Sequence, residues 1–270
     1  MSRGQIPTDK MKSIQERLPD LSDVMRKVRI LSPDTISIRT GPKSRIPIAA
    51  VCFNDAFSTL EETHYAIRES YAHEVWYREE TNPPDQLTSN YFVRFYCDDA
   101  ALRLYAAIEH LANAILAMVP TNKSILKRYR SKRVNLAAAV RKYLVNHRPN
   151  HSVTKSVSKL AQSQDWIQTL DYRGLWVHQQ PPLVSGFGMQ WKRNVRWQEI
   201  IVDGNVTGFR LYGGSGGDKA DLTVEELRRR TGSAFALFVQ VYDEVLDFYL
   251  RLLARKKIRL KGNSLTVKLP

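Results

Sequence analysis

The stretch FNDAFSTLEETHYAIRESYAHEV, residues 53–75, contains the clearest structural signal in the sequence. Its apolar and ring-bearing residues recur at spacings of three and four, at Phe53, Phe57, Leu60, His64, Ile67, Tyr71 and Val75. Such spacing places side chains on one face of an α-helix, so the stretch predicts one long amphipathic helix. Asn82-Pro-Pro-Asp85 ends this helix, because consecutive prolines cannot continue it.

The same periodicity continues along the chain after these prolines. Helical patterns cover residues 90–119, 124–147 and 153–170, and a last long helix follows a capping box formed by Thr223 and Glu226. Consecutive helices joined by short links favour antiparallel packing. The sequence therefore predicts a mainly α fold, an antiparallel helical bundle.

One β-hairpin interrupts the helical texture near residues 196–212. Residues 196–202 and 206–212 have strand-like composition and flank Asp203-Gly204, a common hairpin turn dipeptide. We expect this hairpin to be an insertion between the fourth helical pattern and the last helix.

Three regions are expected along the chain. Residues 1–50 form an N-terminal extension packed on the main body, with a short amphipathic helix near residues 10–18 and a short strand at Ile36 and Ile38. Residues 51–257 form the helical domain with its hairpin, and residues 258–270 form a basic tail.

The formal net charge of +14 is the unusual feature of the composition. A surplus of this size needs either a solvated face or a polyanionic partner to offset the self-repulsion, and among partners nucleic acid is favoured over an anionic membrane surface. The N-terminus lacks the apolar core of a signal peptide, and the longest apolar run, residues 106–119, is interrupted by polar residues. We therefore expect a cytoplasmic protein that does not enter a membrane.

A run of basic residues in the third helical pattern is the candidate RNA-binding region. Its members are Lys127, Arg128, Arg130, Lys132 and Arg133. Two interpretations stay open from the sequence, a solvated helix face and an RNA groove.

The usual motifs of metal and nucleotide chemistry do not occur in the sequence. No two histidines form a His-x3-His or His-Glu-x-x-His pair on one helical face, and Cys52 and Cys97 form neither a disulfide framework nor a metal cluster. Gly213-Gly-Ser-Gly-Gly217 lacks the Gly-Lys-Ser/Thr ending of a P-loop. The sequence thus implies no metal and no other cofactor.

The stretch Asp171-Tyr-Arg-Gly-Leu-Trp-Val-His-Gln-Gln-Pro-Pro182 is the candidate site. It places Arg173 and His178 five positions apart, but Arg68 and His73 have the same spacing inside a continuous helical pattern. Gly174 and the two prolines predict a bend that aims the Arg173 and His178 side chains at one cleft. Aromatic residues near this stretch could stack on bases or pack in the core: Trp166, Tyr172, Trp176, Trp191 and Trp197.

A mostly helical chain with an Arg-x4-to-6-His motif, here Arg173-Gly-Leu-Trp-Val-His178, resembles the HEPN superfamily. The resemblance covers roughly residues 52–257 as an architecture. It implies a homodimer that cleaves RNA without a metal, in toxin, defence or RNA-processing systems, with a neutralising partner protein as a further expectation. It also implies that Arg173 and His178 are catalytic, with Asp171 and Tyr172 supporting them.

The two residue types suit RNA cleavage. A histidine titrating near neutrality can act as base or acid, and an arginine can hold the phosphate and stabilise its developing charge. Members of the family often carry Asn, Asp or His where this chain has Gly174. Two competing hypotheses follow, a non-catalytic module of the same architecture that binds RNA or a partner protein, and a purely structural cap at a helix end.

Overall fold

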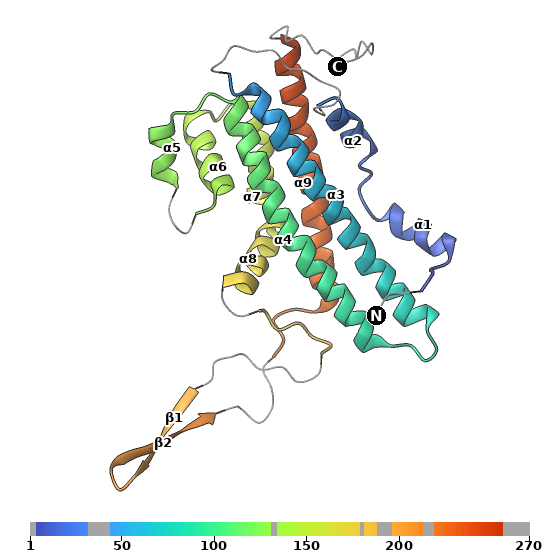
Figure 1. The fold of residues 1–270 in the computed structure, drawn as a ribbon, viewed down its shortest axis with the longest axis vertical. Helices are drawn as coiled ribbons and strands as arrows, with labels where there is room; N and C mark the ends of the chain where they lie inside the picture. The colour runs from blue at the N-terminus through green and yellow to red at the C-terminus, as the bar shows by residue number, and fades with distance from the viewer. Residues whose placement is uncertain are drawn as a thin grey trace.

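The computed structural model describes residues 4–31, 44–130, 134–178, 181–187, 196–212 and 219–255. It confirms a mainly helical bundle with an inserted β-hairpin (Figure 1). The elements in chain order are α1 (Thr8–Glu16), α2 (Ser22–Arg29), α3 (Ile46–Val75), the π-helical turn η1 (Trp76–Glu80), α4 (Gln86–Met118), α5 (Lys123–Tyr129), α6 (Leu136–His147), α7 (Ser152–Gln162), α8 (Gln164–His178), β1 (Arg196–Val202), β2 (Asn205–Tyr212) and α9 (Val224–Arg255).

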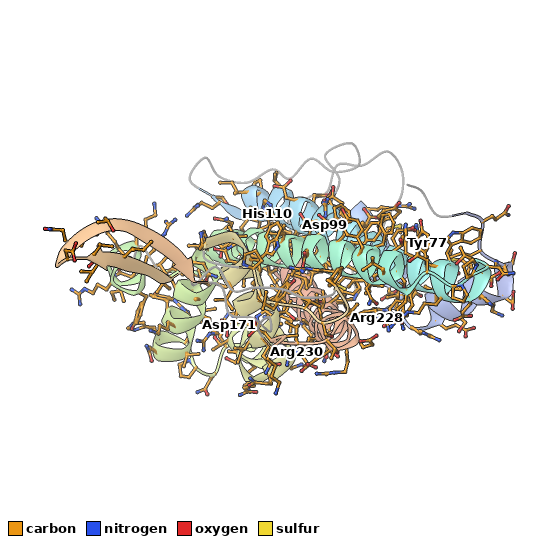
Figure 2. The ribbon with its side chains drawn as sticks, turned by 90° about the horizontal axis from the view of Figure 1, so that it is seen from below. Tyr77, Asp99, His110, Asp171, Arg228 and Arg230 are labelled. Atoms are coloured by element: carbon orange, nitrogen blue, oxygen red, sulfur yellow. The ribbon has the colours of Figure 1, made fainter. Side chains whose placement is uncertain are left out.

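Helices α3 and α4 form the long hairpin on which the other helices pack. The two helices are joined through η1 and the proline turn, and Asp85 caps α4 by accepting a hydrogen bond from the Thr88 amide at 2.9 Å. The first turns of α9 are tied to the end of α3, since Arg228 pairs with Glu74 and lies over the Tyr71 ring at 4.6 Å (Figure 2). The first turns of α9 therefore lie against the C-terminal end of α3.

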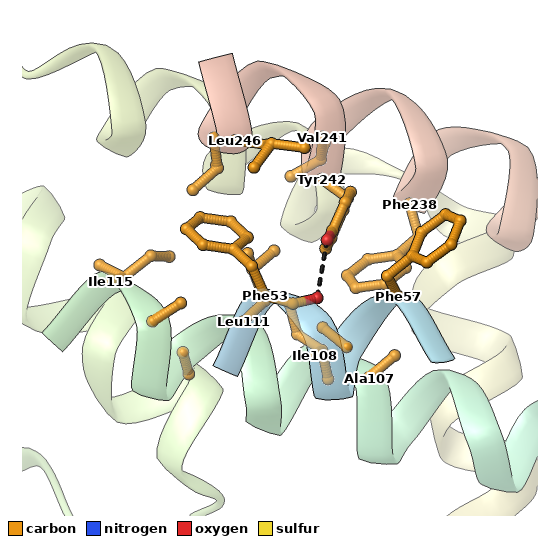
Figure 3. Close-up of a cluster of buried hydrophobic side chains, with 14 of the residues drawn as sticks. Phe53, Phe57, Ala107, Ile108, Leu111, Ile115, Phe238, Val241, Tyr242 and Leu246 are labelled. Atoms are coloured by element: carbon orange, nitrogen blue, oxygen red, sulfur yellow. Dashed lines mark hydrogen bonds between the residues drawn. The ribbon is translucent and has the colours of Figure 1, made fainter. Parts of the chain in front are cut away.

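The core lies where α9 crosses the α3–α4 hairpin, and large aromatic side chains fill it (Figure 3). Phe53 and Tyr242 meet edge to face, with ring centroids 5.7 Å apart. The Tyr242 hydroxyl donates to the Phe53 carbonyl at 2.8 Å, and the Tyr249 hydroxyl donates to the Ile46 carbonyl at 2.7 Å. Each buried hydroxyl is thus satisfied by a carbonyl of α3.

Two of the predicted helices are each divided in two. The third pattern consists of α5 and α6, and the Asn135 side chain begins α6 by accepting from the Ala138 amide at 2.7 Å. The fourth pattern consists of α7 and α8, separated at Ser163, which has an extended backbone. In each case a polar residue with a non-helical backbone starts a new helix where the apolar period alone predicted continuity.

The hairpin lies where the sequence predicts it, with its turn at Asp203-Gly204. Asp203 and Gly204 both have positive φ, 52° and 78°, as a two-residue turn between right-twisted strands requires. Val202 pairs with Asn205, and the pairing shifts between Ile200 and Ile201. Figure 1 shows the hairpin projecting away from the helices.

The N-terminal helices pack along α3. Helix α1 lies near its predicted position, whereas α2 was not predicted; it buries Val24 and Val28, and Lys27 pairs with Asp243 of α9 at 2.7 Å. The strand expected at Ile36 and Ile38 and the basic tail at 258–270 lie outside the described residues. Within the described ranges, no helix has both the length and the apolar character needed to cross a bilayer.

Candidate functional site

Arg173 and His178 lie in the last turns of α8, and their side chains meet. Helix α8 continues without interruption through Gly174 to His178, so the bend predicted at Gly174 is absent. Residues five apart diverge by about 140° around a helix. The long arginine side chain nevertheless reaches the exposed histidine, and Arg173 Nη1 lies 3.3 Å from His178 Nε2.

The Arg173 side chain is held against α4. Its guanidinium carbon lies 3.8 Å from the centroid of the Tyr105 ring, a close cation–π contact. Its Nε is shielded and has no hydrogen-bond partner among the described residues. Stacking on the Tyr105 ring orients the guanidinium, and Nη1 lies next to His178.

Tyr172 points the other way, into the protein. Its hydroxyl donates to Asp98 Oδ1 of α4 at 2.5 Å, and Arg94 Nε lies 3.6 Å from the other carboxylate oxygen. Burial raises the pKa of Asp98 despite the Tyr172 hydrogen bond and the Arg94 charge, and burial together with Asp98 raises the pKa of Tyr172 well above its usual range. Tyr172 therefore anchors α8 to α4 and does not face the solvent beside His178.

The anchor extends beyond α8. Arg94 Nη2 donates to the Pro182 carbonyl at 3.4 Å, and the Arg94 guanidinium lies 5.5 Å from the centre of the Phe187 ring. Arg94, Asp98 and Tyr105 were not predicted as part of the site. The i, i+4 spacing of Arg94 and Asp98 is typical of an ion pair on a helix, but only the packing of α8 on α4 shows what the pair supports.

Asp171 is not brought together with Arg173 and His178. It lines a separate cavity between α4, α6, α7 and α8. Figure 2 shows Asp171 on the α8 side of the bundle, well away from Tyr77 and Arg228.

The basic candidates lie on α5 and just beyond it. Lys127, Arg128 and Arg130 are exposed, while Lys132 and Arg133 lie outside the described residues. The sequence around them is one-sided in charge, since residues 120–164 contain 11 Lys and Arg and no Asp or Glu. Figure 1 places α5 and α6 on the same side of the long helices as α8.

The aromatic residues near the candidate stretch divide between core and surface. Trp166 is buried and stacks on Phe238 with ring centroids 5.4 Å apart, and Tyr172 is buried as described. Trp176 is 37% exposed, between Leu175 and Val177, which are each 40% exposed. Trp191 and the Trp197 side chain lie outside the described residues.

No group of three or more His, Cys, Asp or Glu side chains in the described parts of the chain has the geometry of a metal site. Comparison with protein-family models, with curated proteins and with solved structures finds no match to this chain. The geometry of α8 and its surroundings is therefore the basis for any functional assignment.

Proposed function

We propose that this protein is a metal-independent endoribonuclease of HEPN type, which uses Arg173 and His178 at a cleft between two copies of the chain. The observation that carries the proposal is the contact between a half-buried, stacked arginine and an exposed histidine, 3.3 Å apart. An arginine so oriented can hold a phosphate by its fork of donors, next to an imidazole that can accept or donate a proton.

The contact suggests how the pair works. Arginine can only donate, so His178 Nε2 accepts the hydrogen bond in the free protein and carries a lone pair. When a phosphodiester takes the Arg173 donors, Nε2 becomes available to accept the proton of the ribose 2′-hydroxyl. The 2′-oxygen then bonds to phosphorus, the bond to the 5′-oxygen breaks, and the departing oxygen takes a proton from an acid.

One histidine cannot be base and acid in the same step, so a second copy of the site supplies the other role. The exposed apolar residues Leu175, Trp176 and Val177 lie between Arg173 and His178 on α8 and favour a surface that a second protomer covers. The acid-free segment at residues 120–164 provides the positive charge that holds the RNA backbone.

The alternative function is a non-catalytic module of the same architecture that binds RNA or a partner protein. The exposed basic side chains of α5 favour it as well, because they bind a polyanion whether or not cleavage follows.

RNA cleavage with a chelator present tests the proposal. We expect single-stranded RNA to be cut to products with 2′,3′-cyclic phosphate and 5′-hydroxyl ends, and His178→Ala to lower the rate by about 100- to 10,000-fold. His110→Ala is the matched control, because His110 is on α4 and lies apart from Asp171 and the α8 side of the bundle (Figure 2). If His178→Ala leaves the rate of RNA cleavage unchanged, the nuclease proposal is wrong. Salt-dependent RNA binding without cleavage would establish the non-catalytic alternative.

A further inference from the structure

The cavity that Asp171 lines is the second site on α8. It has a volume of about 420 Å³ and lies between α4, α6, α7 and α8. Most of its wall is apolar, including Ile108 of α4, Leu160 of α7 and Trp166 of α8. A volume and lining of this kind are typical of small-ligand sites, which range from about 300 to about 1,000 Å³.

The polar groups of the cavity come from three side chains, Asn135, Arg141 and Asp171. Arg141 and Asp171 have opposite charges, and no ion pair joins them or engages either one within the described ranges. The Asn135 oxygen is occupied by the Ala138 amide, which leaves its Nδ2 group as a donor. The cavity thus offers a carboxylate acceptor and two donors, with no net charge.

The adjacent N-terminus of α6 does not add an anion site. The amides of Leu136 and Ala137 already donate to the Glu109 carboxylate, at 3.2 and 2.9 Å. A phosphate or carboxylate at this helix end would meet Glu109 in place of free amides. A neutral ligand with both donors and acceptors fits the cavity better than an anion does.

We propose that this cavity binds a guanine base. A carboxylate pairs with the two adjacent donors of guanine, N1–H and the N2 amino group, while arginine and asparagine donate to its acceptors O6 and N7. The other bases do not present two adjacent donors on one edge. The apolar wall with Trp166 matches the flat faces of a base that has left its stack.

This inference rests on the proposed function for its biological substrate, an RNA whose extruded guanine enters the cavity. The cavity and the Arg173–His178 pair use the same two helices. Ile108 in the cavity wall and Tyr105 beneath Arg173 are three residues apart on α4, about 4.5 Å along its axis. On α8, Leu170 in the cavity wall and Arg173 are also three residues apart. A base held in the cavity therefore positions a nearby phosphodiester at Arg173, and sets the cleavage specificity.

Titration with the four nucleoside 5′-monophosphates tests the inference independently of catalysis. Ligand-observed NMR detects weak binding, and we expect the guanosine nucleotide to bind at least about tenfold more tightly than the other three. Asp171→Asn weakens that binding by about tenfold or more. Ala161→Leu fills the apolar wall and abolishes binding, while Asp55→Asn, an exposed change on α3, leaves it unchanged.

Mapping the cut sites in RNA completes the test. We expect a guanosine at a fixed position beside each cut, and loss of this preference in Asp171→Asn. If the protein binds guanosine nucleotide but does not cleave RNA, the guanine site is supported and the nuclease proposal is overturned. Equal binding of all four nucleotides, or no binding of any, overturns the guanine site even when RNA is cut.

Discussion

Two places in this chain carry an arginine followed five residues later by a histidine, and they differ in nearly everything else. In α3, His73 is 3% exposed, donates from Nδ1 to the Glu69 carbonyl at 2.9 Å, and packs against Phe92 with ring centroids 4.4 Å apart. Arg68 pairs with Glu69 at 3.2 Å. In α8, His178 is exposed and its close partner is Arg173.

The difference shows that surroundings, and not spacing, decide what such a pair can do. The imidazole of His73 has its surface covered by aromatic rings, so it contributes packing and cannot reach a substrate. The imidazole of His178 is open to solvent at the end of a helix, next to a guanidinium fixed over the Tyr105 ring. Only the α8 pair combines access, positive charge and a proton acceptor.

The largest expected difference between the two pairs is in RNA cleavage. We expect Arg173→Lys to lower kcat/KM by about 100- to 1,000-fold, because an ammonium has neither the planar fork nor the stacking face that Tyr105 fixes. Arg68→Lys is the matched change and should alter kcat/KM by less than about twofold. Single-turnover kinetics on a short RNA measure both. Equal losses at the two positions would remove the distinction drawn between the pairs.

The two pairs also differ in their contribution to stability, and here His73 is expected to matter more than His178. His73→Ala should lower the free energy of unfolding by about 2–4 kcal/mol, since it leaves a cavity among aromatic rings and removes a buried hydrogen bond. His178→Ala is an exposed change and should stay within about 0.5 kcal/mol of the parent. Urea unfolding followed by circular dichroism measures the two values. A larger loss for His178→Ala would mean that this residue is structural, as a helix cap is.

The anchor of Tyr172, Asp98 and Arg94 holds α8 on α4 and has no counterpart at His73. Burial raises the folded-state pKa of Asp98 above its unfolded value. Its contribution to stability is therefore fully present below the unfolded pKa of about 3.9, and is lost as pH rises through the folded pKa. Asn at this position can still accept from Tyr172 but does not ionise. We expect the stability of Asp98→Asn relative to the parent to increase from about pH 4 to about pH 7.

Urea unfolding at several pH values in that range gives this difference directly. Asp55→Asn is the control, because Asp55 is exposed on α3 and lies away from the anchor. If the stability of Asp98→Asn relative to the parent decreases as pH rises, the attraction of Arg94 and the Tyr172 hydrogen bond outweigh the burial of the Asp98 carboxylate.

Local signals in the sequence were sufficient for most of the fold. The period of residues 53–75 identified α3, and Asp203-Gly204 identified the hairpin turn, because both depend on neighbouring residues only. The division of the third and fourth helices had a local signal too. Asn135 and Ser163 are residues typical of helix starts, yet the apolar pattern runs across them and hides the break.

The site was only partly accessible from the sequence. Arg173 and His178 stand out through a motif, but Tyr105 occupies a position on the apolar stripe of the pattern at residues 90–119, and such a position by itself indicates core packing. Its role beneath the guanidinium depends on how α8 crosses α4, which no local pattern specifies. The same is true of α2, whose Lys27 finds Asp243 more than 200 residues along the chain.

The smallest expected effect is that of Gly174→Ala, which tests the bend that the sequence wrongly predicted at this position. The sequence predicts a bend at Gly174, between Arg173 and His178, whereas α8 is helical there and a methyl group at position 174 would meet nothing within 4 Å. Gly174→Ala should raise the free energy of unfolding by about 0.5–1 kcal/mol, because alanine loses less conformational entropy in a helix. RNA cleavage should be unchanged, since neither side chain of the pair moves. If Gly174→Ala instead lowers the free energy of unfolding, the backbone at position 174 has a conformation that alanine cannot adopt. The chain would then bend at Gly174, and the geometry of the α8 pair would differ from that of a pair on a continuous helix such as α3.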